Sequence, residues 1–264
     1  MKIGFIGGGA MAEALAKGIL GSHAAEPGDV FISDHKASRA EALTRRYGLH
    51  GMVGAASFLP DVDALFLAVK PQAAEAAMAE AASGVRSGAV IISIVAGLTL
   101  ARLEEHFPSQ PVIRVMPNTP AAVGEGMSAY ALGSHAYQDA ARLAEKLLSG
   151  MGRTACVNEP LLDAVTGLSG SGPAYAFLVI DALADGGVAA GLPRAQAIEM
   201  AAQTLLGAAR MVLSGTHPDV LRDQVTSPAG TTIAGVRVLE QRGVRGAFLD
   251  AVVAATERSR ELGK

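Results

Sequence analysis

Residues 3–12 read I-G-F-I-G-G-G-A-M-A, an apolar run that leads into three consecutive glycines and a helix-forming stretch. Gly7, Gly9 and Ala12 fit the pattern G-x-G-x-x-[GA], which is informative here because it follows a predicted strand and opens a predicted helix. The first glycine would make a tight turn, the second would let the backbone reach a pyrophosphate, and the alanine would let helix and sheet approach. The run therefore predicts a dinucleotide site. The residues that we assign to it are Gly7, Gly9, Ala10 and Met11.

Strands and helices alternate through the first part of the chain. Such alternation predicts a parallel sheet with helices on both faces, that is, an α/β domain of the Rossmann type. Beyond about residue 158 the strand pattern stops, and the rest is typical of helices. We therefore expect a dinucleotide-binding domain over 1–158 and an all-α dimerisation and substrate domain over 159–264. The predicted strands are 1–6, 30–33, 51–53, 64–69, 90–94, 111–116 and 153–157, and the helices among them are 11–20, 37–47, 71–82, 99–107 and 140–150.

Composition and charge exclude several classes of protein. The 264 residues are 50% hydrophobic, with a formal net charge of −3 and no basic tract, so nucleic acids and acidic membrane surfaces are not expected partners. No apolar run approaches the ~20 residues that span a membrane. The single cysteine, Cys156, excludes an internal disulfide framework. No cluster of His, Cys and acidic residues has metal-site spacing. We expect a cytoplasmic protein without a metal.

The second predicted domain is more apolar than a small isolated bundle needs. Residues 176–180 read A-F-L-V-I, which is hydrophobic on every side of a helix. Helices that are apolar all round are buried, and here a second copy of the chain would bury them. We predict an obligate homodimer formed through residues of about 160–264.

The end of the second predicted strand decides which dinucleotide binds, and its residues point in two directions. Asp34 would hydrogen-bond a ribose 2′-hydroxyl, which favours NAD. His35, Lys36 and Arg39 follow and could clamp a 2′-phosphate, which favours NADP. On balance we expect NADPH, with NADH also used. Further candidate contacts follow the fourth strand, at the sheet edge where such folds bind ligands: Ala68, Val69, Lys70 and Pro71.

Two turns rich in hydroxyl groups and glycine interrupt the helical part. Residues 168–175 read L-S-G-S-G-P-A-Y, and residues 225–232 read V-T-S-P-A-G-T-T. Each places hydroxyl groups and unpaired backbone N–H groups where a helix begins, and a small anion binds well at such a position. With a dinucleotide fold upstream, these turns suggest an enzyme that holds a small carboxylate against a nicotinamide.

Taken together, the motifs resemble those of pyrroline-5-carboxylate reductases. The resemblance covers essentially the whole chain, and its later stretches are more specific than the glycine fingerprint. It rests on G-F-I-G-G-G-A-M at 4–11, A-V-K-P at 68–71, M-P-N-T-P at 116–120, L-S-G-S-G-P-A-Y at 168–175, D-A-L-A-D-G-G-V at 181–188 and S-P-A-G-T-T at 227–232. The family implies reduction of L-1-pyrroline-5-carboxylate to L-proline by NAD(P)H, the last step of proline biosynthesis. It also implies a dimer with intertwined helical domains, often assembled into a larger ring of dimers.

The resemblance also implies roles for individual residues. Ser227 and Thr232 match positions that hold the substrate carboxylate. The backbone N–H groups of Gly230 and Thr231 would lie nearby. Thr166 matches a threonine that hydrogen-bonds the ring nitrogen or donates its proton. The residues that match loops around the nicotinamide are Ala96, Gly97, Pro117 and Asn118.

One position departs from the family pattern. The turn is usually S-P-G-G-T-T, and this chain has Ala229 in place of a glycine. If the position requires a positive φ, an alanine there would be strained by roughly 1 kcal/mol.

Reduction of a cyclic imine fits what the chain offers. The imine nitrogen is basic, so the substrate can arrive as an iminium that accepts hydride without a strong base or a metal. After Lys146 the only lysine is Lys264, whereas related dehydrogenases of 3-hydroxy acids use a lysine in the first long helix of their helical domain. Two alternatives remain open: a reductase of another small cyclic imine acid, and a non-catalytic NADP-binding sensor.

Overall fold

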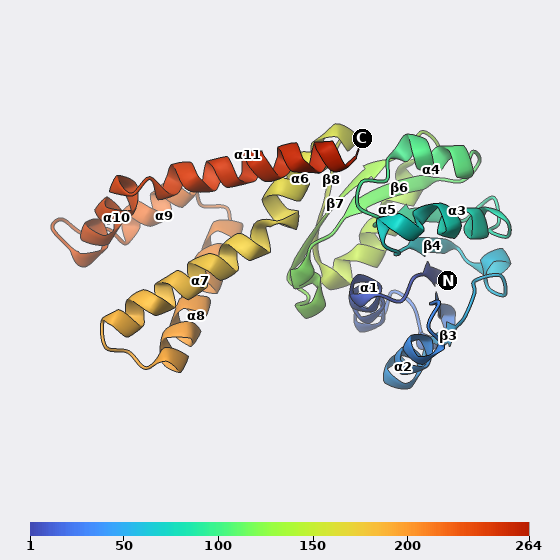
Figure 1. Ribbon diagram of the computed structural model, residues 1–264, viewed down its shortest axis with the longest axis horizontal. Helices are drawn as coiled ribbons and strands as arrows, with labels where there is room; N and C mark the ends of the chain where they lie inside the picture. The colour runs from blue at the N-terminus through green and yellow to red at the C-terminus, as the bar shows by residue number, and fades with distance from the viewer. Residues whose placement is uncertain (264) are drawn as a thin grey trace. The chain divides into compact units, whose positions relative to one another are not determined.

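The computed structural model describes residues 1–263, which form two compact units (Figure 1). The sheet unit comprises Met1–Gly170 together with the segment that begins at Ala255, and the helical unit comprises Ser171–Ala254. Residues 159–170 thus pack with the sheet. The predicted functional boundary at residue 158 stays a prediction, because compactness does not show where substrate and partner are bound.

The sheet unit is built on one sheet, which has eight strands among the described residues, in the order β3-β2-β1-β4-β5-β6-β7-β8. The chain starts in the middle of this sheet and winds outward first to β3 and then, from β4, to the other side. The reversal beside β1 opens a crevice at the carboxyl ends of the strands, where ligands of such folds bind. The strands are β1 (Ile3–Ile6), β2 (Val30–Ser33), β3 (His50–Met52), β4 (Ala64–Leu67), β5 (Val90–Ser93), β6 (Val112–Met116), β7 (Gly126–Leu132) and β8 (Gly152–Cys156).

Helices cover both faces of the sheet, as the alternation predicted (Figure 1). Strand residues alternate between the two apolar cores: Phe5 belongs to the first and Ile6 to the second. Phe5 also stacks on Phe66 of the neighbouring strand, with ring centroids 4.7 Å apart. On the first face lie α1 (Ala10–Gly21), α2 (Ala37–Tyr47) and α5 (Gln138–Leu148), and on the second lie α3 (Ala74–Ala82), α4 (Leu100–His106) and α6 (Leu162–Val165).

Strand β7 is the one element of the sheet that the sequence did not predict. It runs antiparallel to β6, with Val115 opposite Tyr130, whereas the other neighbouring strands are parallel. The connection 117–125 holds only a short 3-10 turn. A parallel crossover needs a dozen or more residues, so a connection of this length returns the chain antiparallel.

The helical unit has almost no core of its own. Helices α7 (Gly172–Ala189) and α8 (Arg194–Leu213) pack side by side, and the buried residues among the described part of this unit are Ala184, Ala197 and Ala201. Large apolar side chains stay outside: Phe177 is 63% exposed and Leu178 is 67% exposed. The remaining helices are α9 (Pro218–Gln224), α10 (Thr231–Gln241) and α11 (Val244–Leu262), the last of which ends in the sheet unit.

Candidate functional site

The loop between β1 and α1 has the backbone of a pyrophosphate cradle. Gly7 has φ +101°, and a Cβ there would lie 2.5 Å from the carbonyl oxygen of Ala68, so only glycine fits. Gly9 precedes the first helical residue, has an ordinary φ of −66°, and would meet nothing within 4 Å if it carried a Cβ. No side chain caps α1. Its first N–H groups, on Ala10 and Met11, therefore have no capping side chain and suit an anion.

A cavity of about 370 Å³ lies beside this loop. Three residues predicted from the sequence, Gly7, Asp34 and Val69, lie in its wall, so this part of the prediction converges on one place. His35, which the sequence also offered as a contact for a 2′-phosphate, lies in the wall as well. The residues of the lining that were not predicted are Ile6, Ser33, Val53, Gly54, Ala73, Ala76, Ala77 and Glu80. Several of these follow β3 or belong to α3. The rule that ligands bind at the carboxyl ends of strands could have pointed to the residues after β3.

Asp34 is fixed at the mouth of this cavity by backbone groups. Its carboxylate accepts a hydrogen bond from the N–H of Gly8 at 3.0 Å and one from the N–H of Lys36 at 2.9 Å. A carboxylate has about four acceptor positions. Asp34 thus braces the glycine loop and keeps capacity to accept a ribose hydroxyl.

Arg39 does not stand free as a phosphate clamp. Its Nε donates to the carbonyl oxygen of Gly8 at 2.6 Å, and its Nη2 donates to Glu13 Oε2 at 2.6 Å. From the sequence we expected Arg39, like Lys36, to be available to a 2′-phosphate. The structure corrects this expectation, because the guanidinium of Arg39 already forms hydrogen bonds within the protein. The partner, Glu13, lies in the first turn of α1 and carried no signal by itself.

The fourth strand ends as expected at the same edge of the sheet. The N–H of Ala68 donates to the carbonyl oxygen of Ile6 at 2.9 Å, which continues the pairing of β4 with β1 by one residue. Lys70 is exposed and precedes a 3-10 turn that starts at Pro71. Of these four candidates, Val69 is the one that lines the cavity.

Asn118 is a brace between two loops. Its Nδ2 donates to the carbonyl oxygen of Ser169 at 3.0 Å, and its Oδ1 accepts the N–H of Met127 at 2.9 Å. The residue was predicted to lie in a loop around the nicotinamide, and both ends of its side-chain amide are used within the protein. It ties the end of β6 both to the start of β7 and to the turn that holds Thr166.

Thr166 begins a π-helical turn, Thr166–Gly170, at the end of α6. Such turns are rare in proteins as a whole, and those that occur are often found at functional sites. The Thr166 hydroxyl is partly buried and donates to the carbonyl oxygen of Leu162 at 2.8 Å. Its proton is therefore engaged, and the oxygen can still accept a hydrogen bond.

The loops after β5 and β6 contain the other nicotinamide candidates. Gly97 has φ +77°, which favours glycine, and Ala96 precedes it directly. Pro117 follows the last residue of β6. All three follow carboxyl ends of strands, as predicted for ligand contacts in such a sheet.

In the helical unit, the turn 227–232 leads into α10. Gly230 is the residue before the helix, and its N–H donates to the carbonyl oxygen of Ser227 at 3.0 Å. No side chain caps the helix. Within residues 1–263, the hydroxyls of Ser227, Thr231 and Thr232 have no hydrogen-bond partner. The turn therefore offers hydroxyl groups and helix N–H groups to an anion.

Ala229 has φ +55°, so the position does require the left-handed conformation. Replacing Ala229 with glycine is expected to raise the free energy of unfolding by up to about 1 kcal/mol, because the relieved strain of ~1–2 kcal/mol exceeds the added freedom of the unfolded chain. Urea unfolding at fixed protein concentration measures the change. Ala234→Gly, an exposed position inside α10, is the control and should destabilise by about 0.5–1 kcal/mol. If both variants lost the same amount of unfolding free energy, the backbone of Ala229 would not be strained.

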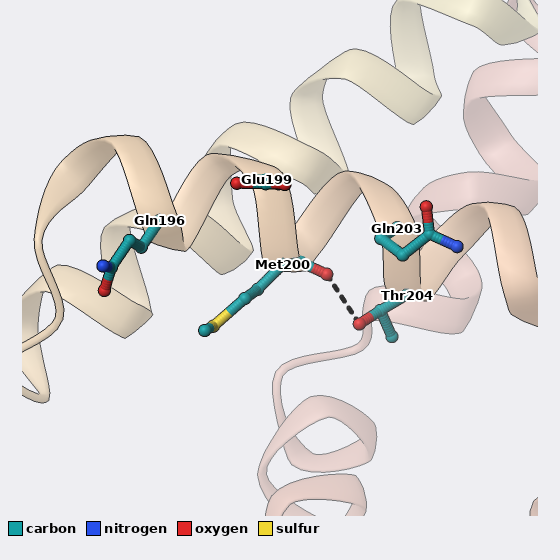
Figure 2. Close-up of a pocket in the computed structure, with 5 residues that line it drawn as sticks. All are labelled: Gln196, Glu199, Met200, Gln203 and Thr204. Carbon is teal, nitrogen blue, oxygen red and sulfur yellow. Dashed lines mark hydrogen bonds between the residues drawn. The ribbon is translucent and has the colours of Figure 1, made fainter.

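A second hollow, of about 590 Å³, lies on α8 and has a different character. Figure 2 shows its lining side chains, and all of them come from one helix. They follow helical spacing along a single face: Gln196, Glu199, Met200, Gln203 and Thr204. The Thr204 hydroxyl donates to the carbonyl oxygen of Met200 at 2.7 Å. Four of these five side chains are polar, which is typical of a helix face exposed to solvent.

Two sequence families match separate parts of the chain. Residues 159–262 match the family described as pyrroline-5-carboxylate reductase dimerisation, and residues 2–97 match the family described as NADP oxidoreductase, coenzyme F420-dependent. The pyrroline-5-carboxylate reductase of Arabidopsis thaliana is 45% identical over 264 residues, which are 100% of this chain and 96% of the plant protein. The chain belongs to the pyrroline-5-carboxylate reductase family.

Solved structures of this family have the same fold. A pyrroline-5-carboxylate reductase from Coxiella burnetii superposes with a TM-score of 0.93 at 31% identity and covers 100% of this chain and 98% of its own. The pyrroline carboxylate reductase of Plasmodium falciparum, solved with NADP bound, gives a TM-score of 0.88 at 30% identity, with the same coverage. These matches confirm the resemblance and the fold class. The match of residues 159–262 to the dimerisation family supports a homo-oligomer.

No group of three or more His, Cys, Asp or Glu side chains in 1–263 is placed to hold a metal ion. None of the helices in the same range combines the length and the apolar character needed to cross a membrane.

Proposed function

We propose that this protein reduces L-1-pyrroline-5-carboxylate to L-proline with NAD(P)H, the last step of proline biosynthesis. The observation that carries the proposal is the full-length likeness to pyrroline-5-carboxylate reductases, which spans both the glycine loop and the hydroxyl turn. The chemistry is consistent with it. A cyclic iminium needs orientation and a favourable field, and no strong acid or base.

The residues present fit the cofactor. When bound, NAD(P)H supplies the hydride. We assign its pyrophosphate to Gly7, Gly9, Ala10 and Met11, because the added-Cβ contacts leave open space above the start of α1. The adenosine would lie in the cavity at the carboxyl ends of β1 and β2, against Asp34. Lys36, two residues further along the chain, would approach it from the solvent-exposed start of α2. Further cofactor contacts are assigned to Ala68, Val69, Lys70 and Pro71. The nicotinamide side is assigned to Ala96, Gly97, Pro117 and Asn118. Arg39 would act as a brace of the glycine loop through its hydrogen bond to Gly8.

The turn before α10 would bind the substrate carboxylate. Hydroxyl groups of Ser227 and Thr232 would donate to its oxygens, together with the N–H groups of Gly230 and Thr231. The free hydroxyls and the uncapped helix support this assignment. The partial positive charge at the start of a helix favours a carboxylate there.

Thr166 would act at the ring nitrogen as an acceptor. Its hydroxyl proton goes to the carbonyl oxygen of Leu162 in the free protein. The lone pairs of its oxygen remain available to receive the N–H of an iminium. Donation of a proton by Thr166 would require this internal hydrogen bond to break first.

The oligomer is proposed to be a homodimer formed through residues 159–264, and a ring of such dimers is the larger assembly that we propose. Apolar side chains exposed on the helical unit support a dimer, because a single chain leaves them in water. We propose a cytoplasmic location, in keeping with a single, unpaired Cys156.

The test is to mix the purified protein with pyrroline-5-carboxylate and NADPH, then NADH, and to follow the loss of reduced-nicotinamide absorbance. Oxidation of the cofactor with formation of proline is the expected result. Turnover of a larger cyclic imine acid, but not of pyrroline-5-carboxylate, would favour the first alternative. Binding of NADPH without turnover of either would favour a sensor. Both outcomes would overturn the proposal.

A further inference from the structure

Near the adenosine end of the cofactor cavity, an acidic side chain, Asp34, and a basic one, Arg39, already form hydrogen bonds within the protein. Asp34 lines the cavity and remains an acceptor for a ribose hydroxyl, as described above. A 2′-phosphate at the same place would meet its negative charge. Recognition of NADP therefore depends on the cations that follow β2 before and in the first turn of α2, which are Lys36 and Arg39.

Arg39 has lost its best edge for a phosphate. Nε and Nη2, which form one edge of the guanidinium, donate to Gly8 and to Glu13, both at 2.6 Å. A fork of two parallel N–H groups is what makes arginine a strong phosphate ligand. With this edge used, Arg39 keeps three N–H donors, two on Nη1 and one on Nη2, but its guanidinium is held in place by Gly8 and Glu13.

The surroundings of Glu13 stabilise its ion pair with Arg39. Its side chain is 18% exposed, against 32% for Arg39. Its other oxygen, Oε1, accepts hydrogen bonds from Arg46 Nη1 and from the Tyr47 hydroxyl, both at 2.8 Å. The hydrogen bond from Arg39 is the main reason why the pKa of Glu13 lies below its usual value, despite the opposing effect of burial. Glu13 is thus ionised at neutral pH, and it accepts a charge-assisted hydrogen bond from Arg39.

Lys36 is left as the cation that can meet a phosphate freely. It is exposed, and within residues 1–263 its ammonium group has no hydrogen-bond or ion-pair partner. A lysine acts on a phosphate as a point charge and adds less geometric selectivity than a bidentate arginine.

We propose that Glu13 is a specificity-determining residue, which holds Arg39 away from the 2′ position and so lets the protein accept NADH beside NADPH. The inference rests on the proposed use of NAD(P)H. The preference between the two cofactors would thus depend on a residue in the first turn of α1 that does not line the cavity.

The test is a binding experiment, so it does not depend on turnover. Dissociation constants for NADP⁺ and NAD⁺ are measured by calorimetry for the wild type, Glu13→Gln, Arg39→Gln and the double variant. The neutral glutamine keeps the shape but weakens the grip on Arg39. The preference for NADP⁺ over NAD⁺ should rise roughly 10-fold in Glu13→Gln. In the double variant this gain should disappear, because it requires Arg39.

The matched control is Glu41→Gln. Glu41 lies on α2, the helix of Arg39, but it pairs with Arg45 at 3.6 Å and is exposed. Its variant removes an equal charge and should leave the preference as in the wild type. Thermal unfolding checks that Glu13→Gln is folded; if it is not, Glu13→Asp, with its carboxylate withdrawn by one methylene, should shift the preference in the same direction.

Three results would overturn the inference. The preference could stay within about twofold of the wild type in Glu13→Gln, the gain could persist in the double variant, or Glu41→Gln could produce the same gain. The last two would reduce the effect to net charge. If the wild type did not turn over pyrroline-5-carboxylate but the variants changed the NADP⁺/NAD⁺ preference as expected, only the proposed function would be contradicted. If the wild type bound neither dinucleotide, both the proposed function and the inference would be overturned.

Discussion

Replacing Gly9 with alanine is expected to weaken dinucleotide binding while the free protein stays as stable as the wild type. An added methyl group meets nothing within 4 Å, and the φ of −66° suits any residue. The same space is where a pyrophosphate would approach the start of α1. Crowding there should cost about 1–3 kcal/mol, or roughly 5- to 150-fold in the dissociation constant. Titration with NADPH and thermal unfolding of the free protein measure the two effects.

Two other glycines make this result specific. Gly21, at the end of α1, also has open space around it, so Gly21→Ala should change neither cofactor binding nor the fold. Gly7→Ala should destabilise the free protein, since its Cβ would clash with the backbone of Ala68 at a φ of +101°. If Gly9→Ala bound NADPH as tightly as the wild type, the pyrophosphate would not lie where we place it.

Replacing Thr232 with valine is expected to raise the KM for pyrroline-5-carboxylate by roughly 10- to 140-fold, as the loss of one hydrogen bond to a charged group costs about 1.5–3 kcal/mol. The change removes a hydroxyl but keeps the shape of the side chain. Thr232 is the second residue of α10, and its hydroxyl is free for a ligand. The dissociation constant of NADPH should stay as it is, because the assigned cofactor contacts lie in the other unit.

Two variants bracket this prediction. Thr232→Ser keeps a hydroxyl and should restore most of the affinity. Thr226→Val removes a hydroxyl that already donates to the carbonyl oxygen of Arg222 at 2.6 Å, so the KM should remain close to that of the wild type. An unchanged KM in Thr232→Val would show that the carboxylate is bound elsewhere. Steady-state kinetics at saturating NADPH gives all three values.

Features that depend on neighbours in the sequence were predicted well. The helix 37–47 and the strand 30–33 have the predicted bounds. The glycine loop also follows from local chemistry, because Gly7 is required by its own backbone conformation. Likewise, the suspicion about Ala229 came from one departure in a motif, and the positive φ is found there. Patterns of this kind report on the residue and on the few residues around it.

Features that depend on distant residues were missed. Strand β7 was not predicted, since its pairing with β6 depends on a sheet edge formed by other strands. Asn118 contacts Ser169, 51 positions away, and its role as a brace is invisible from the motif M-P-N-T-P.

The sequence by itself determined the alternation of strands and helices that makes the α/β domain, the glycine loop and the family. The tertiary structure decided which charges remain free at the adenosine end. Arg39 looked available because it follows Lys36 in the sequence, but folding places Glu13, 26 positions away, against it. Local patterns specify which groups are present, and only packing determines which of them are already paired.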